Sequence, residues 1–209
     1  MGLFDSMRRA SARRKATGAL GAFYAAPLRD DRYLAVDIET TGQDPSTDRL
    51  LSIGWVPVDG DEIVLGGAGH VVIRGAGGEE SVGESATLHG LTDDQIAAGG
   101  DREEAVELLL RALAGRTLLA HYARMEVGFL DKACREIYGA PFNVDTADTM
   151  DREYARYAAM DRDPGREDLR LWNTRDRYGL PPYKAHHALT DALSCAELWL
   201  AQNAAGLKK

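Results

Sequence analysis

The 209-residue chain has only two cysteines, 7% aromatic residues and no long apolar run. No apolar stretch approaches the roughly 20 residues that a helix needs to cross a bilayer, so a membrane-spanning helix is not expected. Cys134 and Cys195 lie far apart in helix-like apolar stretches and lack the spacing of a disulfide framework or a zinc site. They are therefore expected to be buried thiols in a reducing compartment, which favours a cytoplasmic location.

Positive charge is also scarce. The chain has 25 Lys and Arg against 33 Asp and Glu, for a net charge of −8. Residues 1–32 carry +4, so the remaining residues carry −12. Affinity for nucleic-acid phosphates normally comes from Lys and Arg. An acidic body therefore argues against an extended grip on a polyanion, although bound cations can reverse the local sign of charge.

The basic segment 1–32 is expected to form an N-terminal arm. Its helically spaced Leu3, Phe4, Met7 and Ala10 predict an amphipathic basic helix that contacts nucleic acid, an acidic protein or a membrane surface. A solvated or loosely docked arm is an equal alternative. A signal peptide is disfavoured, because residues 16–26 are rich in Gly and Ala and lack a strongly apolar centre.

The remaining pattern predicts one α/β domain, because alternating apolar runs are interleaved with amphipathic stretches. Thr92 and Gln95 have the spacing of a capping box. A turn is expected at residues 59–61. Strands are expected near 33–41, 50–58, 70–73 and 117–121, and helices near 101–114, 123–138, 148–159, 169–178 and 188–202.

Two carboxylates, Asp37 and Glu39, lie at the end of the first predicted strand, just before Gly42. Residues two apart in a strand share one face, so both side chains can bind one cation. The pair alone is weak, because an acid-x-acid pattern is expected about five times by chance in so acidic a chain. The preceding residues are otherwise apolar, however, and an unpaired charge there is costly unless a cation neutralises it.

Two later segments supply further candidate ligands. Glu126 lies in the first turn of the helix that follows the predicted strand 117–121. His186 precedes Asp191 by five residues at the start of an Ala- and Leu-rich helix. Each has an ordinary explanation by itself, since an acidic residue near a helix start is favoured by the helix dipole.

Taken together, Asp37-x-Glu39, Glu126 and His186-x4-Asp191 have the order and approximate spacing of the DEDDh 3′→5′ exonuclease motifs. The chain resembles this family, which includes the DNA polymerase III proofreading subunit, ribonuclease T and oligoribonuclease. The resemblance extends from residue 33 to about 203. It includes the segment 88–92, whose Leu-His-Gly-Leu-Thr is similar to a His-Gly-Ile-Thr stretch in the family.

The resemblance implies a ribonuclease H-like fold, with a central mixed sheet flanked by helices. It places the exonuclease domain at residues 33–205 and leaves 206–209 as a tail. The implied activity is metal-dependent hydrolysis of phosphodiester bonds at the 3′ end of single-stranded DNA or RNA. The sequence leaves open the choice between DNA and RNA, and the oligomeric state.

One motif departs from the family pattern, which usually reads Asn-x-x-Phe-Asp. The matching positions here are Tyr122, Met125 and Glu126. Glu keeps the charge of Asp and adds one methylene, so rate and metal preference are affected more than the reaction type. If Glu126 is not the fourth acidic residue, Asp131 and Asp148 are the alternatives.

The resemblance assigns each residue a function. Asp37 is expected to bridge two metal ions, Glu39 and Asp191 to complete their ligand sets, and Glu126 to bind directly or through water. Mg²⁺ or Mn²⁺ suits a site made only of carboxylates. His186 is expected to be the general base that deprotonates the attacking water. His187 competes with it, since on a continuous helix it would share the face of Asp191.

Substrate contacts are expected from backbone groups at Thr40 and Thr41, and from His89 and Leu91 around the terminal sugar and base. Tyr122 either stacks on a base or packs beside Met125. Two other functions compete with exonuclease activity. One is a catalytically weak nucleic-acid-binding module of the same fold, and the other is a polymerase accessory subunit whose basic arm docks a partner.

Overall fold

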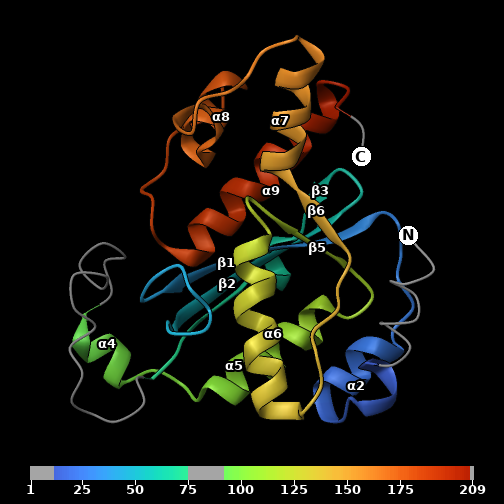
Figure 1. Cartoon of the computed structure of the whole chain (residues 1–209), viewed down its shortest axis with the longest axis vertical. Coiled ribbons are helices and arrows are strands. Elements are labelled where there is room, and N and C mark those ends of the chain that lie inside the picture. The colour runs from blue at the N-terminus through green and yellow to red at the C-terminus, as the bar shows by residue number, and fades with distance from the viewer. Residues whose placement is uncertain (1–11, 75–91, 208–209) are drawn as a thin grey trace.

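The computed structural model describes residues 12–74 and 92–207 of the chain, and its centre is a mixed β-sheet (Figure 1). The strand order is β3-β2-β1-β5-β6, with β4 also paired to β2. β1 pairs antiparallel with β2 and parallel with β5, which pairs parallel with β6. The strands are β1 (Arg32–Thr40), β2 (Leu50–Asp59), β3 (Glu62–Ile63), β4 (Gly69–Val72), β5 (Thr117–Ala120) and β6 (Thr146–Asp148).

The longest pairing in the sheet joins β1 and β2, in register from Arg32 opposite Asp59 to Glu39 opposite Ser52. Their β-branched and apolar residues suit strands buried on both faces. The predicted turn after β2 is present, with Gly60 in the left-handed region at φ 60°. The register shifts between Glu39 and Thr40, which is a bulge-like irregularity at the end of β1.

Helices cover both faces of the sheet. Together α2, α5 and α6 pack on one face and enclose the larger core, whereas α9 crosses β1 and β2 on the other face (Figure 1). On the α9 side, Trp199 stacks against Tyr33 with ring centroids 4.8 Å apart. The helices of these two layers are α2 (Gly18–Ala25), α5 (Arg102–Leu113), α6 (Arg124–Tyr138) and α9 (Ala188–Ala204).

Part of the predicted N-terminal arm belongs to this core. Leu20 and Phe23 of α2 are buried against α5 and α6, and the Tyr24 hydroxyl donates a hydrogen bond to the Pro141 carbonyl at 2.7 Å. Residues 18–25 are therefore part of the packed domain, although the sequence pattern assigned them to the N-terminal arm. The predicted amphipathic residues Leu3, Phe4, Met7 and Ala10 lie outside the described residues.

The remaining helices are α4 (Asp93–Ala97), α7 (Thr149–Ala159) and α8 (Leu171–Arg177), with short 3₁₀ turns η1 (Leu65–Gly67) and η2 (Glu167–Leu169). The predicted capping box is present at the start of α4. The predicted helix 169–178 is divided, because Arg170 has an extended backbone between η2 and α8. Among the described residues, no helix is both long and apolar enough to cross a membrane.

A glycine on β2 sets the distance between α9 and the sheet. Gly54 lies opposite Asp37 in the β1–β2 register. A Cβ atom at Gly54 would lie 2.3 Å from both the Ala188 carbonyl carbon and the Leu189 nitrogen, closer than real Cβ contacts. The first turn of α9 can therefore rest directly on the sheet only because residue 54 has no side chain.

We expect Gly54→Ala to push the start of α9 away from the sheet and to lower the free energy of unfolding by about 1–3 kcal/mol, as overpacking typically does. Denaturant unfolding measures this change. Gly66→Ala is the matched control, because a Cβ at Gly66 meets nothing within 4 Å. Equal stability of the two variants would show that α9 tolerates the displacement.

Candidate active site

Three carboxylates meet where α9 begins against the sheet. Asp37 and Glu39 lie on β1, two residues apart, and Asp191 lies in the first turn of α9. One oxygen from each of these side chains lies within 4.8 Å of the others. The structure thus brings together three of the four predicted metal ligands, from segments more than 150 residues apart in sequence.

Glu126, the fourth predicted ligand, lies close to this group but outside it. It is in the first turn of α6, directly after β5, and its side chain is 4% exposed. Its Oε2 has no hydrogen-bond partner in the described structure. The charge of Glu126 also helps to raise the pKa of Asp37. A buried carboxylate oxygen that has no hydrogen-bond donor can accept a hydrogen bond from a water molecule or coordinate a cation.

Asp131 and Asp148, the alternatives to Glu126, are already engaged. Asp131 accepts hydrogen bonds from the Phe142 backbone and the Arg135 guanidinium. The Asp148 carboxylate accepts from the backbone N–H groups of Tyr122 and Ala123, and it caps the first turn of α7. Asp148 therefore holds the start of α6 in place, and Glu126 is the better candidate for the fourth acidic residue.

Burial makes negative charge costly throughout this cluster. It raises the pKa of Glu39 to about 8, with a further contribution from Asp191, and that of Glu126 to about 8. It raises the pKa of Asp191 to about 6, although the His186 backbone N–H opposes the shift. Burial and the three neighbouring carboxylates raise the pKa of Asp37 well above its ordinary value.

The cluster fits a divalent cation. Its donors are all carboxylate oxygens, the ligands preferred by hard cations such as Mg²⁺ and Mn²⁺. The Oδ1 atom of Asp191 and the Oε2 atom of Glu126 are buried and have no hydrogen-bond donor in the described structure. Cations would supply the missing partners and neutralise charges that burial otherwise disfavours.

The two histidines before α9 have different environments. His187 is not on a continuous helix with Asp191; it is the N-cap, and its Nδ1 accepts from the Thr190 backbone at 3.4 Å. Its ring also stacks on His70, with centroids 4.5 Å apart. The expectation that His187 shares a helical face with Asp191 is therefore wrong, because the helix begins one residue later.

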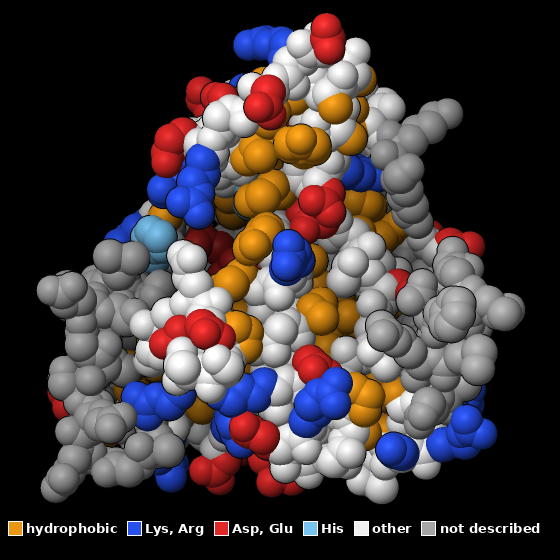
Figure 2. Space-filling model, in the orientation of Figure 1, with side chains coloured by type: hydrophobic (Ala, Val, Ile, Leu, Met, Phe, Trp, Pro, Cys, Tyr) orange, Lys and Arg blue, Asp and Glu red, His pale blue; other side chains and the backbone are white. Residues whose placement is uncertain are grey.

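His186 is joined to the carboxylate cluster through its backbone. Its N–H donates to the Asp191 Oδ2 atom at 3.0 Å. The residue has the left-handed φ of 66°, which is uncommon for a non-glycine residue. The residue is exposed. In the space-filling view, acidic side chains lie in a hollow of the surface and a histidine lies beside that hollow (Figure 2).

The predicted substrate contacts are described only in part. Thr40 and Thr41 lie just past the irregularity at the end of β1, and the Thr41 hydroxyl accepts from the Arg49 backbone at 3.0 Å. Tyr122 has a positive φ of 79° and is 42% exposed, so part of its ring is accessible to a base. His89 and Leu91 lie outside the described residues.

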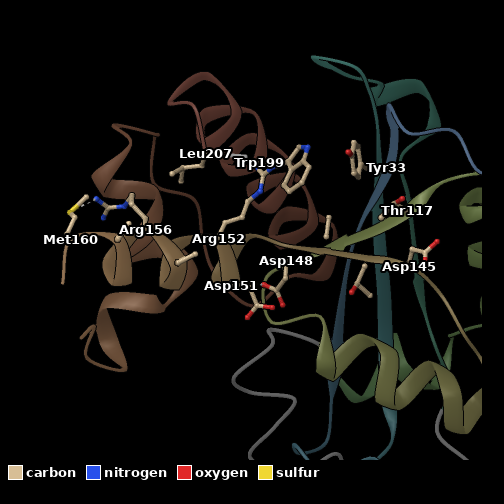
Figure 3. A pocket seen from close by; sticks show the side chains of 14 residues that line it. Tyr33, Thr117, Asp145, Asp148, Asp151, Arg152, Arg156, Met160, Trp199 and Leu207 are labelled. Carbon is tan, nitrogen blue, oxygen red and sulfur yellow. Dashed lines mark hydrogen bonds between the residues drawn. The ribbon is translucent and has the colours of Figure 1, made fainter. Parts of the chain in front are cut away.

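A cavity of about 680 Å³ lies apart from the carboxylate cluster (Figure 3). It borders β6 and lies between α7 and the C-terminal half of α9, with Trp199, Arg152 and Met160 in its wall. Of the predicted site residues that the structure describes, only Asp148, an alternative to Glu126, lines it. Cavity size therefore does not mark the candidate active site in this fold.

Two features that build the site were not predicted from the sequence. One is the role of Gly54, and the other is that Asp148 caps a helix. A glycine inside an apolar strand is a signal of close backbone approach, and Gly54 gives that signal. Asp148 immediately precedes a helix, which is the position of a capping residue. Its second function, binding the backbone at Tyr122 and Ala123, depends on tertiary structure and has no local signal.

Comparison with known proteins assigns the family. Residues 34–199 match the model of the RNase_T family, described as exonuclease. The chain belongs to this exonuclease family. The predicted class, a DEDDh-type 3′→5′ exonuclease, is thereby confirmed.

Related sequences are polymerase components. The chain is 29% identical over 167 residues to the DNA polymerase III subunit epsilon of Treponema pallidum, covering 80% of this chain and 74% of that protein. It is 27% identical over 171 residues to the PolC-type DNA polymerase III of Thermotoga maritima. That match covers 82% of this chain but 12% of the relative, so the chain spans a small part of the PolC-type polymerase.

Solved structures share the fold. E. coli exonuclease I in complex with a dA16 oligonucleotide superposes with a TM-score of 0.72 at 16% identity, covering 84% of this chain and 41% of that chain. Cell-death related nuclease 4 superposes with a TM-score of 0.72 at 13% identity, covering 86% and 65%. The predicted ribonuclease H-like fold, with a mixed sheet flanked by helices, is confirmed.

The raised carboxyl pKa values predict how stability depends on pH. Because the folded-state pKa values of Glu39, Glu126 and Asp191 exceed their unfolded values, the folded chain binds more protons than the unfolded chain between about pH 4 and 8. The stability of the metal-free protein should therefore fall as the pH rises through this range. Thermal unfolding in EDTA, followed from pH 5 to 8, measures the change.

Added Mg²⁺ or Mn²⁺ should raise the unfolding temperature more at pH 8 than at pH 5, because protons compete with the cation at the lower pH. The same titration with Asp191→Asn is the control and should show a smaller metal effect. If the metal raised the unfolding temperature equally at both pH values, the prediction would be contradicted, because cation binding would then not compete with protonation of these carboxylates.

Proposed function

We propose that this domain hydrolyses the terminal phosphodiester bond at the 3′ end of single-stranded DNA or RNA, using two divalent cations and His186 as general base. The observation that carries the proposal is the convergence of Asp37, Glu39 and Asp191, with the backbone of His186 bonded to Asp191. Glu126 borders the same group. The family match supports the reaction class, and the acidic donors support the metal requirement.

Asp37 would contact both cations, since it is the residue on which the charges of Glu126, Asp191 and Glu39 all act. Glu39 and Asp191 would hold one cation between β1 and α9, and Glu126 would approach from α6. Bound Mg²⁺ or Mn²⁺ would supply activation of the attacking water and stabilisation of the negative charge on the phosphate and the leaving 3′ oxygen.

His186 would accept the proton of the attacking water. It is exposed, and its backbone N–H donates to Asp191 of the cluster, whereas His187 caps α9 and stacks on His70. An imidazole has an unperturbed pKa close to neutrality, which suits a general base at physiological pH. The hydrogen bond from the His186 backbone N–H to the Asp191 carboxylate would keep the imidazole of His186 next to the cluster.

The terminal nucleotide would lie beside the end of β1. Thr40 and Thr41 directly follow the shift in the β1–β2 register, next to Glu39. The partly exposed ring of Tyr122 is available to stack on a base, a contact worth about 1–3 kcal/mol. The relation to the epsilon and PolC-type sequences supports a further proposal, that the domain acts beside a DNA polymerase.

A degradation assay tests the proposed function. A 5′-labelled single-stranded oligonucleotide should be shortened from its 3′ end in Mg²⁺ or Mn²⁺, and EDTA should abolish the reaction because the carboxylates alone cannot stabilise the developing charge. A blocked 3′ end should stop degradation, and a blocked 5′ end should not. Matched DNA and RNA oligonucleotides identify the preferred substrate, and activity that persists in EDTA would contradict the metal requirement.

His186→Ala should lower kcat by roughly 10²- to 10⁴-fold, the usual contribution of a positioned base, with little change in KM. Steady-state kinetics on the same oligonucleotide measures both constants. His187→Ala is the matched control and should lower stability through loss of the cap, by about 1 kcal/mol, with a much smaller effect on kcat. A larger kcat loss in His187→Ala than in His186→Ala would reverse the assignment.

A further inference from the structure

His186 lies on a connection without helix or strand, residues 178–187, between α8 and α9. Most of this connection is exposed. A catalytic side chain must usually be held within about 0.5 Å of its productive position. The hydrogen bond from the His186 N–H to Asp191 fixes the end of the connection nearest α9. Another contact is needed to fix the connection before His186.

A buried arginine on α8 makes that contact. The Arg175 side chain is 1% exposed, and its guanidinium reaches three acceptors. Nη2 donates to the Pro181 carbonyl at 2.9 Å and lies 2.8 Å from the Glu197 carboxylate on α9. Nη1 donates to the Ser194 carbonyl on α9 at 2.7 Å. One side chain thus joins α8, the connection and α9.

Tyr183 attaches the connection to α9 a second time, through Glu197. Its hydroxyl donates to the Glu197 carboxylate at 2.9 Å, and its ring lies 4.9 Å from the Arg175 guanidinium carbon. The Glu197 carboxylate therefore pairs with the Arg175 guanidinium and accepts the hydrogen bond of the Tyr183 hydroxyl. The connection is attached to α9 at Pro181 and Tyr183, which lie five and three residues before His186.

A buried ion pair is weak evidence for added stability, since apolar residues of similar volume often replace such pairs at little cost. Its geometric effect is more specific. The planar guanidinium presents several donors in fixed directions, so the three acceptors are held at set positions relative to one another. Those acceptors belong to the two segments that must meet for His186 to lie beside Asp191.

We propose that Arg175 is a positioning residue that acts through His186. It fixes Pro181 against α9, so that the short stretch 182–186 can place the imidazole only at the rim of the carboxylate cluster. This inference rests on the proposed function, because it needs His186 to be the base. In the described structure, no hydrogen bond or ion pair joins Arg175 to the carboxylates that would hold the cations, although its charge lowers the pKa of Asp191 and so partly offsets the effect of burial.

Arg175→Met tests the inference, since Met keeps most of the volume and removes every donor. We expect kcat to fall by roughly 10- to 100-fold with little change in KM, the scale of a misplacement of about 1 Å. Arg175→Lys keeps the charge and one donor direction and should recover part of the loss. Tyr183→Phe, on an exposed residue, should show a smaller loss in the same direction.

The double variant Arg175→Met/His186→Ala gives the discriminating result. If Arg175 acts only through His186, the double variant should be no slower than His186→Ala alone. A purely structural effect would multiply the two losses. The thermal shift produced by Mn²⁺ should be retained in Arg175→Lys, because the carboxylates remain in place and the charge that acts on Asp191 is kept.

Arg152→Met is the matched control. Arg152 is also a buried arginine that binds α9, through the Asn203 side chain at 2.7 Å and over the Trp199 ring at 3.5 Å, but far along the helix from His186. It should lower stability and leave kcat close to the parent value. Equal kcat losses in the two variants, or a multiplied loss in the double variant, would overturn the inference.

The controls also separate this inference from the proposed function. Full activity in His186→Ala would refute the assigned base, whatever Arg175 does. A large loss in His186→Ala together with normal kcat in Arg175→Met and Tyr183→Phe would refute the positioning inference alone. If Arg175→Met does not fold, Arg175→Lys and Tyr183→Phe decide the same question.

Discussion

The structure depends on holding like charges together at one end of the sheet. Asp37, Glu39, Glu126 and Asp191 come from β1, α6 and α9. Burial raises the pKa of all four, and repulsion within the group raises those of Asp37 and Glu39 further. Such a group disperses unless the elements that carry it are fixed by other contacts. The apolar cores on the two faces of the sheet provide those contacts, and the absence of a side chain at Gly54 sets how closely α9 approaches.

Much of this arrangement could be predicted locally. The period of two along β1 was enough to place Asp37 and Glu39 on one face, and the helices that begin near 102, 124 and 188 follow from apolar spacing and caps. The meeting of Asp191 with Asp37 was different. No pattern within either segment encodes a contact over 154 residues, so that prediction depended on resemblance to a family with the same order of motifs.

Other features could not be predicted because they are decided by tertiary contacts at single residues. His187 is a cap rather than a helical residue, and the one-residue difference moves its ring from the face of Asp191 to the ring of His70. The left-handed backbones of His186 and Tyr122 carry no sequence signal in non-glycine residues. The short arm helix α2 is buried by partners on α5 and α6 that lie more than 70 residues later.

The distribution of arginines explains how so acidic a chain can act on a polyanion. Arg32 and Arg116 both bind Asp59, Arg156 and Arg177 both bind Glu153, and Arg175 binds Glu197. Apart from Arg156–Glu153, which lies within α7, these pairs connect different elements of the fold, and all of them leave their guanidinium groups less available to phosphates. In the proposed mechanism, cations bound by the carboxylate cluster would add to the attraction for a nucleic-acid strand. Such attraction is strong but short in range, which suits contact with a strand end rather than with a long stretch of backbone.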